Sequence, residues 1–227
     1  MDEAVRRILV PGGVHLSGRL HVPKRDAAAG VVVAHPHPLE GGDMENPVVR
    51  AVAEEAASRG LATLRFDFRH VRGRAGLDEA TLVADSEADL LAAVENLRTA
   101  LPPGAPVALV GYSFGGVTAL RVAAKAEAAA VGVVGLPVVR SLAPFLPTGA
   151  MVPATVPVLV MQGVLDELGA PEAVTAWAKG AGVAVEVRPV PGAAHGYYGK
   201  AEFVGKILGG FLTRRLAPSS GPGSHAG

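Results

Sequence analysis

Residues 107–116 read Val107-Ala108-Leu109-Val110-Gly111-Tyr112-Ser113-Phe114-Gly115-Gly116, a short apolar run that stops at a Gly-x-Ser-x-Gly sequence. The apolar run predicts a buried strand, and the alanine-rich residues 117–126 predict a helix. A serine on such a turn is held in a strained backbone conformation that keeps its hydroxyl clear of both elements. Gly111 and Gly115 would avoid clashes with side chains, and Gly116 would let the helix approach the sheet. A chance match is the alternative in a chain with 29 glycines, but the flanking strand and helix are the context that the motif requires.

Strand and helix patterns alternate on both sides of this turn. Residues 6–10 and 15–22 predict two antiparallel strands around a Pro-Gly-Gly turn. Further strands are predicted at 30–34, 61–66, 129–136, 156–161 and 183–190, and helices at 46–59, 86–99, 171–179 and 202–215. Residues 35–42, rich in proline and glycine, predict a loop without regular structure. We therefore expect one α/β domain over residues 1–216, with a mostly parallel sheet covered by helices on both faces, and a flexible tail over 217–227.

Composition excludes several classes of partner. The 227 residues include 21 basic and 21 acidic side chains, so no global field attracts nucleic acid or an anionic membrane. There is no cysteine, hence no disulfide framework and no thiolate nucleophile. The charged start of the chain lacks the apolar core of a signal peptide, and prolines in the uncharged residues 141–165 disfavour a membrane-spanning helix. We expect a cytoplasmic protein.

Two residues downstream of Ser113 complete a candidate catalytic set. A serine hydroxyl needs a base within hydrogen-bond reach and an acid that orients that base. Asp166 follows the predicted strand at 156–161, although the adjacent Glu167 is an alternative. His195 follows the last predicted strand, and the order Ser, Asp, His with each member after a strand is hard to obtain by chance. In this interpretation His195 takes the proton of Ser113, Asp166 orients the ring, and the protonated ring then hands the proton to the leaving group.

Backbone N–H groups are expected to bind the negatively charged oxygen that forms in such a reaction. One should belong to Phe114, the residue after the nucleophile. The other should come from the loop after the strand at 30–34, where Pro36 and Pro38 have no N–H to give. His37 and Leu39 remain as candidates, and we favour His37.

These residues together resemble the α/β-hydrolase superfamily, in particular the small, lidless enzymes similar to dienelactone hydrolase. The resemblance rests on residues 35–46, which begin His-Pro-His-Pro, on 64–76, on 111–116, on Asp166 and on 192–196. It covers the whole chain except the tail, and implies an α/β-hydrolase fold without a large cap domain, with Ser113, Asp166 and His195 as the catalytic triad. The chain departs from the family at residues 66–74, where Phe-Asp-Phe-Arg-His-Val-Arg-Gly-Arg stands in place of Phe-Asn-Phe-Arg-Gly-Val-Gly-Arg-Ser.

A metallohydrolase, a phosphate-binding protein and a protein that keeps the fold without the chemistry are alternative interpretations of this sequence. His35 and His37 form a His-x-His pair, but a metallohydrolase would have Asp at position 39, where this chain has Leu39. The glycine-rich turn lacks the Lys-Ser/Thr ending of a phosphate-binding loop. A protein that keeps the fold without the chemistry is a further alternative. We expect no metal and no cofactor.

The expected substrate is a small-molecule ester with a small or short acyl chain, although peptidase or thioesterase activity uses the same triad. The short connection at residues 140–155 leaves no room for a cap domain, which predicts an open site. The predicted substrate-binding residues are Leu39, Tyr112, Leu142 and Phe145, and the apolar wall could extend to Leu146, Met151 and Val152. Arg69, Arg72 and Arg74 are candidates for a carboxylate pocket. The oligomeric state cannot be inferred from the sequence.

Overall fold

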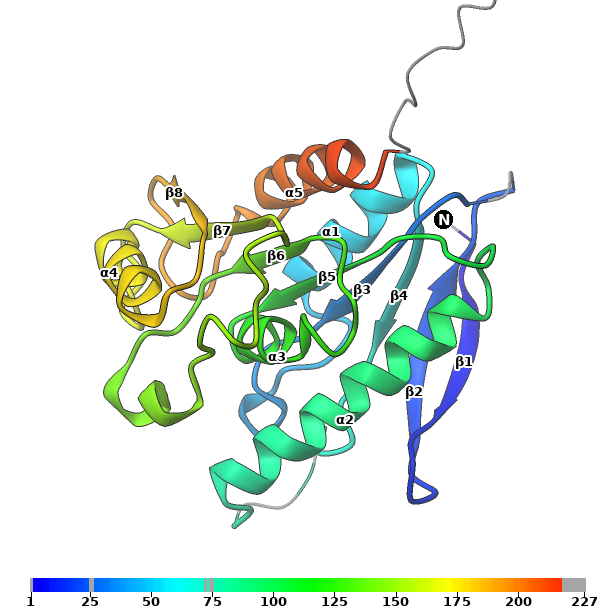
Figure 1. Ribbon diagram of the computed structural model, residues 1–227, viewed down its shortest axis with the longest axis horizontal. Coiled ribbons are helices and arrows are strands. Elements are labelled where there is room, and N and C mark those ends of the chain that lie inside the picture. The colour runs from blue at the N-terminus through cyan, green and yellow to red at the C-terminus, as the bar shows by residue number, and fades with distance from the viewer. Residues whose placement is uncertain (1, 25–26, 72, 74–75, 218–227) are drawn as a thin grey trace, which may run out of the picture.

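The computed structural model describes residues 2–24, 27–71, 73 and 76–217, and shows one eight-stranded sheet between two layers of helices (Figure 1). The strands are β1 (Ala4–Leu9), β2 (His15–His21), β3 (Gly30–Ala34), β4 (Ala62–Phe66), β5 (Val107–Tyr112), β6 (Val131–Val134), β7 (Val158–Gly163) and β8 (Glu186–Val190). The helices are α1 (Pro47–Ser58), α2 (Glu79–Arg98), α3 (Phe114–Val122), α4 (Pro171–Ala181) and α5 (Ala201–Leu216), with 3-10 turns η1 (Pro38–Glu40) and η2 (Arg140–Phe145). The predicted tail, apart from Ala217, lies outside the described residues.

The strands follow the order β1-β2-β4-β3-β5-β6-β7-β8 across the sheet. β1 pairs antiparallel with β2, and β2 with β4, whereas all the other neighbours are parallel. The predicted antiparallel pair and the mostly parallel sheet are therefore confirmed. Because β3, β5, β6, β7 and β8 run in one direction, the loops after them gather at one edge of the sheet, where ligands bind in folds of this kind.

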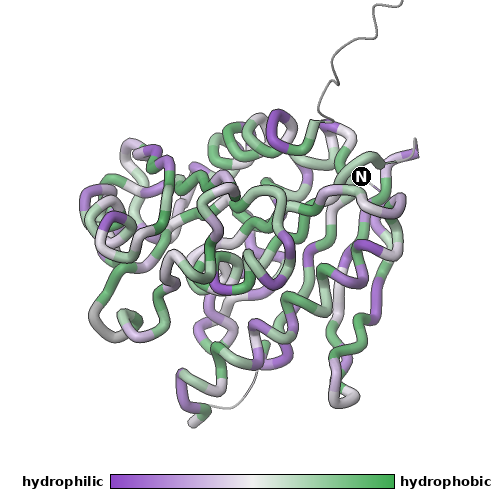
Figure 2. Tube along the Cα trace, in the orientation of Figure 1, coloured by the Kyte–Doolittle hydropathy of each residue, from purple (hydrophilic) through white to green (hydrophobic). Residues whose placement is uncertain are grey.

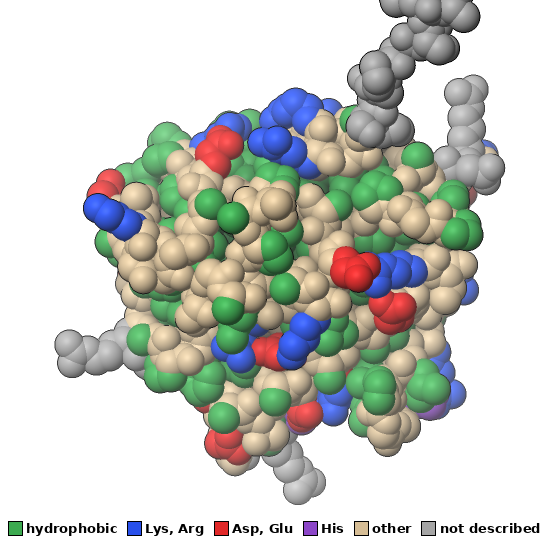
Figure 3. Space-filling model, viewed as in Figure 1, with side chains coloured by type: hydrophobic (Ala, Val, Ile, Leu, Met, Phe, Trp, Pro, Cys, Tyr) green, Lys and Arg blue, Asp and Glu red, His purple; other side chains and the backbone are tan. Residues whose placement is uncertain are grey.

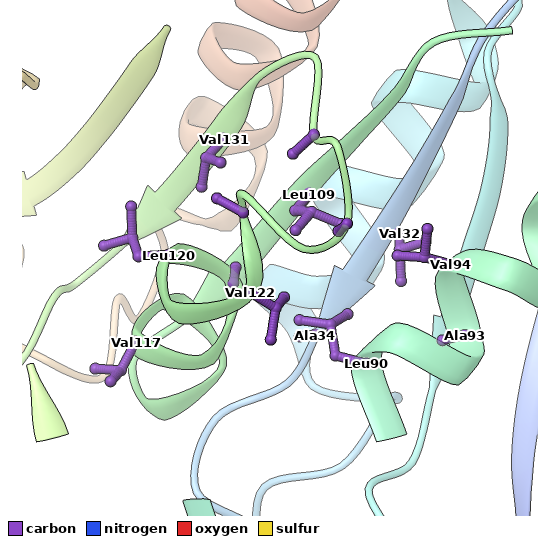
Figure 4. Close-up of a cluster of buried hydrophobic side chains, with 14 of the residues drawn as sticks. Val32, Ala34, Leu90, Ala93, Val94, Leu109, Val117, Leu120, Val122 and Val131 are labelled. Carbon is purple, nitrogen blue, oxygen red and sulfur yellow. The ribbon is translucent and has the colours of Figure 1, made fainter. Parts of the chain in front are cut away.

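Each face of the sheet carries its own hydrophobic core. Side chains of α2, α3 and α4 pack on one face with residues such as Val32, Leu109 and Val131. Side chains of α1 and α5 pack on the other face with residues such as Val33 and Val110. Figure 4 shows Leu90 and Val94 of α2 and Leu120 of α3 in the first of these cores. The central strands β3 and β5 consist mostly of hydrophobic residues (Figure 2) and are buried along their whole length, since a strand covered on both faces has no polar side.

Apart from shifts of one to three residues at the ends of other elements, three predicted elements differ from the structure. The longest helix begins at Glu79 and not at residue 86, because the side chain of Asp78 caps it by accepting a hydrogen bond from the N–H of Thr81. The helix after the serine begins at Phe114 and ends at Val122. The loop at 35–42 contains the η1 turn, which forms because the N–H groups of Glu40 and Gly42 both bond to the carbonyl of His37.

Charged side chains are mixed on the surface. On the face shown in Figure 3, acidic and basic groups lie beside one another with no large region of a single sign. Within the described residues, no helix has both the length and the apolar character needed to cross a membrane. The uncharged segment at 141–165 contains most of η2 and leads into β7, as expected of a connection that ends in a strand.

Candidate active site

Ser113 lies on the sharp turn between β5 and α3, with a backbone φ of 54° and ψ of −119°. This region of φ is strained for a residue with a side chain. The glycines around it have the predicted roles. A Cβ on Gly111 would lie 2.1 Å from the carbonyl oxygen of Gly115, and one on Gly116 would lie 2.6 Å from Val133 Cγ1 in β6. The helix therefore begins directly against the sheet and leaves the serine side chain at the edge where the loops gather.

The structure brings Ser113, His195 and Asp166 together from three different strand ends. Ser113 Oγ lies 2.8 Å from His195 Nε2, and His195 Nδ1 lies 2.9 Å and 3.0 Å from the two carboxylate oxygens of Asp166. A carboxylate can only accept, so Nδ1 carries the hydrogen and Nε2 is free to accept from the serine hydroxyl. Asp166 is only 5% exposed, Ser113 only 7% and the side chain of His195 17%, so the chain of hydrogen bonds is largely shielded from water.

Glu167, the alternative acid, makes a different contact. Its carboxylate accepts a hydrogen bond from the backbone N–H of His195 at 3.2 Å and does not bond to the ring. Its pKa is held below the ordinary value by backbone N–H groups, first its own and then that of His195. The geometry therefore favours Asp166 as the residue that orients the imidazole.

Two buried tyrosines support the histidine loop. The hydroxyl of Tyr112 donates to the carbonyl oxygen of His195. The hydroxyl of Tyr197 donates to the carbonyl of Met161 and accepts from the N–H of Gly163, which ties the loop to the end of β7. The two rings meet edge to face at 5.7 Å. Burial raises the pKa of both hydroxyls, so both are neutral donors at physiological pH.

The two predicted N–H donors lie in neighbouring loops. The ring of His37 packs edge to face on the ring of Phe114 at 5.1 Å, which places the loop after β3 beside the start of α3. Neither the N–H of His37 nor that of Phe114 donates to an acceptor among the described residues. Both are therefore available to a bound oxygen atom.

His35 holds this loop in place. It is fully buried, its Nε2 accepts a hydrogen bond from the N–H of Phe68 at 3.0 Å, and its Nδ1 lies 2.6 Å from the carbonyl oxygen of Pro36. Burial lowers the pKa of this ring from 6.5 to about 4, so the imidazole is neutral at pH 7. Both ring nitrogens are occupied by backbone groups, so His35 cannot join His37 as a metal ligand. No cluster of three or more potential metal-binding side chains occurs within residues 2–24, 27–71, 73 and 76–217.

A cavity of about 680 Å³ opens beside Ser113 and His195. One part of its wall is apolar and consists of Pro137, Val139, Leu142 and Leu168. Another part is polar and consists of His37, Glu40, Asn46 and Glu79. Tyr198, which is 92% exposed, stands at the rim. The cavity thus offers both apolar and polar side chains near the serine hydroxyl.

The structure brings some of the predicted substrate-binding residues to the cavity and not others. Tyr112 and Leu142 line it. Leu39 and Phe145 do not, because their side chains pack against the core beneath α2 and α3. Leu146 and Val152 are buried in the same core, and Met151 packs against it. The predicted apolar wall is therefore reduced to Leu142.

The predicted arginine pocket is not formed by Arg69. Its guanidinium bonds to Asp89, which is fully buried, and to Asp85, both on α2. Arg72 and Arg74 lie outside the described residues. Among the described residues, no lysine or arginine lines the cavity.

Sequence reasoning missed one buried polar residue beside the acid. Gln162 in β7 is fully buried, and its Nε2 donates to Asp166 Oδ2 at 3.0 Å. The available signal was a single polar side chain near the end of an otherwise apolar strand, since such a group is costly to bury without partners.

Comparisons with known proteins agree with the fold. A family model described as alpha/beta hydrolase domain matches residues 27–202. The comparison with curated proteins gave no match. An alpha-beta serine hydrolase homologue from Coxiella burnetii is 28% identical with a TM-score of 0.78, over 93% of this chain and 98% of that one. A serine hydrolase without a lid from Xanthomonas campestris is 27% identical with a TM-score of 0.79, over 96% of this chain and 97% of that one.

The esterase domain of a Rhodothermus marinus protein is 22% identical with a TM-score of 0.73, over 96% of this chain and 100% of that one, and this likeness concerns the fold alone. The family match, in contrast, spans well over half of the sequence and includes the serine turn, Asp166 and His195. The chain therefore belongs to the α/β-hydrolase family.

Proposed function

We propose that the protein is a serine hydrolase that cleaves carboxylic esters with small or short acyl chains. The observation that carries this proposal is the 2.8 Å contact between Ser113 Oγ and His195 Nε2, with Asp166 on the opposite nitrogen of the same ring. A hydroxyl with a neutral imidazole in reach is an activated nucleophile, and the carboxylate fixes the tautomer that can accept its proton.

The reaction follows from this geometry. Ser113 Oγ attacks the ester carbonyl carbon while its proton moves to His195 Nε2, and Asp166 stabilises the imidazolium. The N–H groups of Phe114 and His37 bind the negatively charged oxygen of the tetrahedral intermediate. As the intermediate collapses, the C–O bond to the leaving group breaks, and Nε2 returns the proton to the departing alkoxide. Water then attacks the acyl-enzyme by the same route and releases the carboxylic acid.

The size and lining of the cavity support the proposed substrate class. The apolar wall formed by Pro137, Val139, Leu142 and Leu168 suits an acyl chain of a few carbons. The connection between β6 and β7 contains only the η2 turn and no cap domain. The solved structures that resemble this chain include proteins described as a serine hydrolase without a lid and as an esterase domain, in keeping with this proposal.

The test is hydrolysis of p-nitrophenyl acetate, butyrate and octanoate in buffer with EDTA. Ser113→Ala is compared with Ser58→Ala, a serine at the exposed end of α1 whose hydroxyl bonds only to the carbonyl of Glu55. We expect wild type and Ser58→Ala to cleave the short esters at equal rates and Ser113→Ala to be inactive. Activity that persists in Ser113→Ala, or that EDTA removes, would overturn the proposal.

A further inference from the structure

Gln162 is the feature that the proposed mechanism leaves unused. It lies one residue before the end of β7, where its neighbours Met161 and Val160 are apolar, and its side chain is fully buried. A primary amide with two donors and an acceptor is unfavourable in such a place unless its groups are bonded. The residues it bonds to therefore indicate why it is there.

The amide bonds to two loops, the one after β6 and the one after β7. Oε1 accepts a hydrogen bond from the N–H of Leu136, in the loop after β6, at 2.9 Å. Nε2 donates to Asp166 Oδ2 at 3.0 Å and to the carbonyl oxygen of Gly169. A flipped amide would point Nε2 at an N–H and Oε1 at two acceptors, so the bonded groups allow only one orientation.

This orientation completes the set of donors around Asp166. One carboxylate oxygen, Oδ1, accepts from the N–H of Leu168 at 3.0 Å and from His195 Nδ1. The other, Oδ2, accepts from Gln162 Nε2 and shares His195 Nδ1. With a donor on each oxygen, the plane of the carboxylate cannot rotate away from the imidazole without breaking a bond.

We propose that Gln162 is a positioning residue for the proposed ester hydrolysis, holding the Asp166 carboxylate in the plane that orients His195. It touches neither substrate nor Ser113. It acts through Asp166, which in turn fixes the tautomer and the direction of the His195 ring. The inference rests on the proposed function, because its effect is exerted through the nucleophilic serine.

Two substitutions separate this role from simple packing. Gln162→Met keeps the length of the side chain and removes every hydrogen bond. Gln162→Glu keeps the shape and replaces the donor by a carboxyl, which can donate to Asp166 only while it is protonated. The ionisable groups around this edge of the site are Asp166, Glu167, His195 and the hydroxyls of Tyr112 and Tyr197. Of these, only Asp166 forms a hydrogen bond with Gln162.

The measurements are the pH profile of kcat and KM with p-nitrophenyl butyrate and the rate at which a fluorophosphonate labels Ser113. Rates are corrected for the folded fraction by circular dichroism. For Gln162→Met we expect kcat and the labelling rate to fall roughly tenfold or more at every pH, with KM nearly unchanged, well short of the roughly 10⁴-fold loss seen when a triad acid is lost. For Gln162→Glu we expect near wild-type rates on the acid side of the optimum and a steep loss as the pH rises.

A purely structural role would lower the melting temperature and leave the rates of the folded fraction and the shape of both profiles unchanged, which would overturn the proposal. If Gln162→Met does not fold, the proposal is tested by Gln162→Glu alone: a loss of kcat and of labelling rate at high pH supports it, and a wild-type pH profile overturns it. A wild type that is labelled but cleaves no ester would overturn the ester substrate only, and the labelling rates would still test Gln162. A wild type that is not labelled would overturn both proposals.

Discussion

The hydroxyl of Tyr112 donates a hydrogen bond to the backbone carbonyl of His195, so the residue before the candidate nucleophile holds the residue proposed as its base. The link spans 83 positions in the sequence and joins the end of β5 to the loop after β8. A displacement of the histidine loop is therefore opposed from the serine side of the site as well as by Asp166.

The first prediction concerns this bond. Tyr112→Phe keeps the ring that packs on Tyr197 and removes only the hydroxyl. We expect kcat/KM to fall about tenfold, since a misplacement of the base by a fraction of an ångström is costly in a positioned site. Thr213→Val is the control, because it removes a hydroxyl of α5 that bonds only to the carbonyl of Gly209. A wild-type rate in Tyr112→Phe would show that this bond does not position His195.

The second prediction separates the two adjacent acids. Asp166→Asn should lower kcat by about 10³- to 10⁴-fold, because the imidazole can then adopt the tautomer that cannot accept the serine proton. Glu167→Gln should lower kcat by less than about threefold, because an amide oxygen can still accept from the N–H of His195. Steady-state kinetics with the active enzyme titrated would test both. The reverse ranking would assign the orienting role to Glu167.

The third prediction concerns pH and stability. Burial lowers the pKa of His35 to about 4 in the folded protein, against 6.5 when exposed. Between these values the unfolded chain binds the extra proton, so stability is fully present above pH 6.5 and falls as the pH drops towards 4, by on the order of 3 kcal/mol. Urea unfolding of wild type and His35→Gln at pH 7.5 and 4.5 tests this. We expect the variant to lose less stability on acidification, and equal losses would contradict the prediction.

The fourth prediction concerns the contact between the loop after β3 and α3. A Cβ on Gly115 would lie 2.5 Å from the carbonyl oxygen of His35 and 2.7 Å from that of Ala34. Gly115→Ala should therefore destabilise the protein by about 3 kcal/mol or more, because backbone must move. Gly180→Ala, in α4 with nothing within 4 Å of its Cβ, should instead stabilise the protein by about 0.5–1 kcal/mol. Urea midpoints of the two variants measure both effects.

The fifth prediction concerns the charge of the substrate. The cavity wall carries Glu40 and Glu79, and no lysine or arginine of the described residues lines it. An ester with a free carboxylate, such as p-nitrophenyl hydrogen succinate, should have a kcat/KM several-fold to about tenfold below that of p-nitrophenyl butyrate, since about 1.4 kcal/mol of repulsion equals a factor of ten. Glu79→Gln should reduce the difference in kcat/KM between the two esters, because it removes one negative charge from the cavity wall. A higher kcat/KM for the anionic ester than for p-nitrophenyl butyrate would contradict the prediction.

The sequence predicted the architecture well where single elements carried strong patterns. The apolar runs of β3 and β5 are buried along their whole length, and the predicted antiparallel pair β1 and β2 forms. The predicted start of α2 was wrong, because Ser86 and Asp89 lie on the buried side of the helix and interrupt the spacing of its apolar residues. Asp89 is stabilised there by Arg69, from a loop twenty positions away, and no local pattern reports such a partner.

The candidate site was predictable to the extent that it follows from chain order and strand ends. Ser113, Asp166 and His195 meet as that order suggested, because each follows a parallel strand. The side chains of Leu39 and Phe145 turn to the core, and the sequence does not distinguish an apolar loop residue that faces a cavity from one that faces inward. The links made by Gln162 and Tyr112 depend on tertiary contacts alone.

Strand β8 stands at one end of the sheet, paired with β7, and four of its five residues are partly or fully exposed. Hydrogen bonds on one side only make an end strand the first to fray. His195 follows this strand, so fraying would separate the base from the serine while the central strands remain intact. On heating, the edge strand β8 therefore limits the stability of the site. Activity should be lost at a lower temperature than the one at which the rest of the domain unfolds.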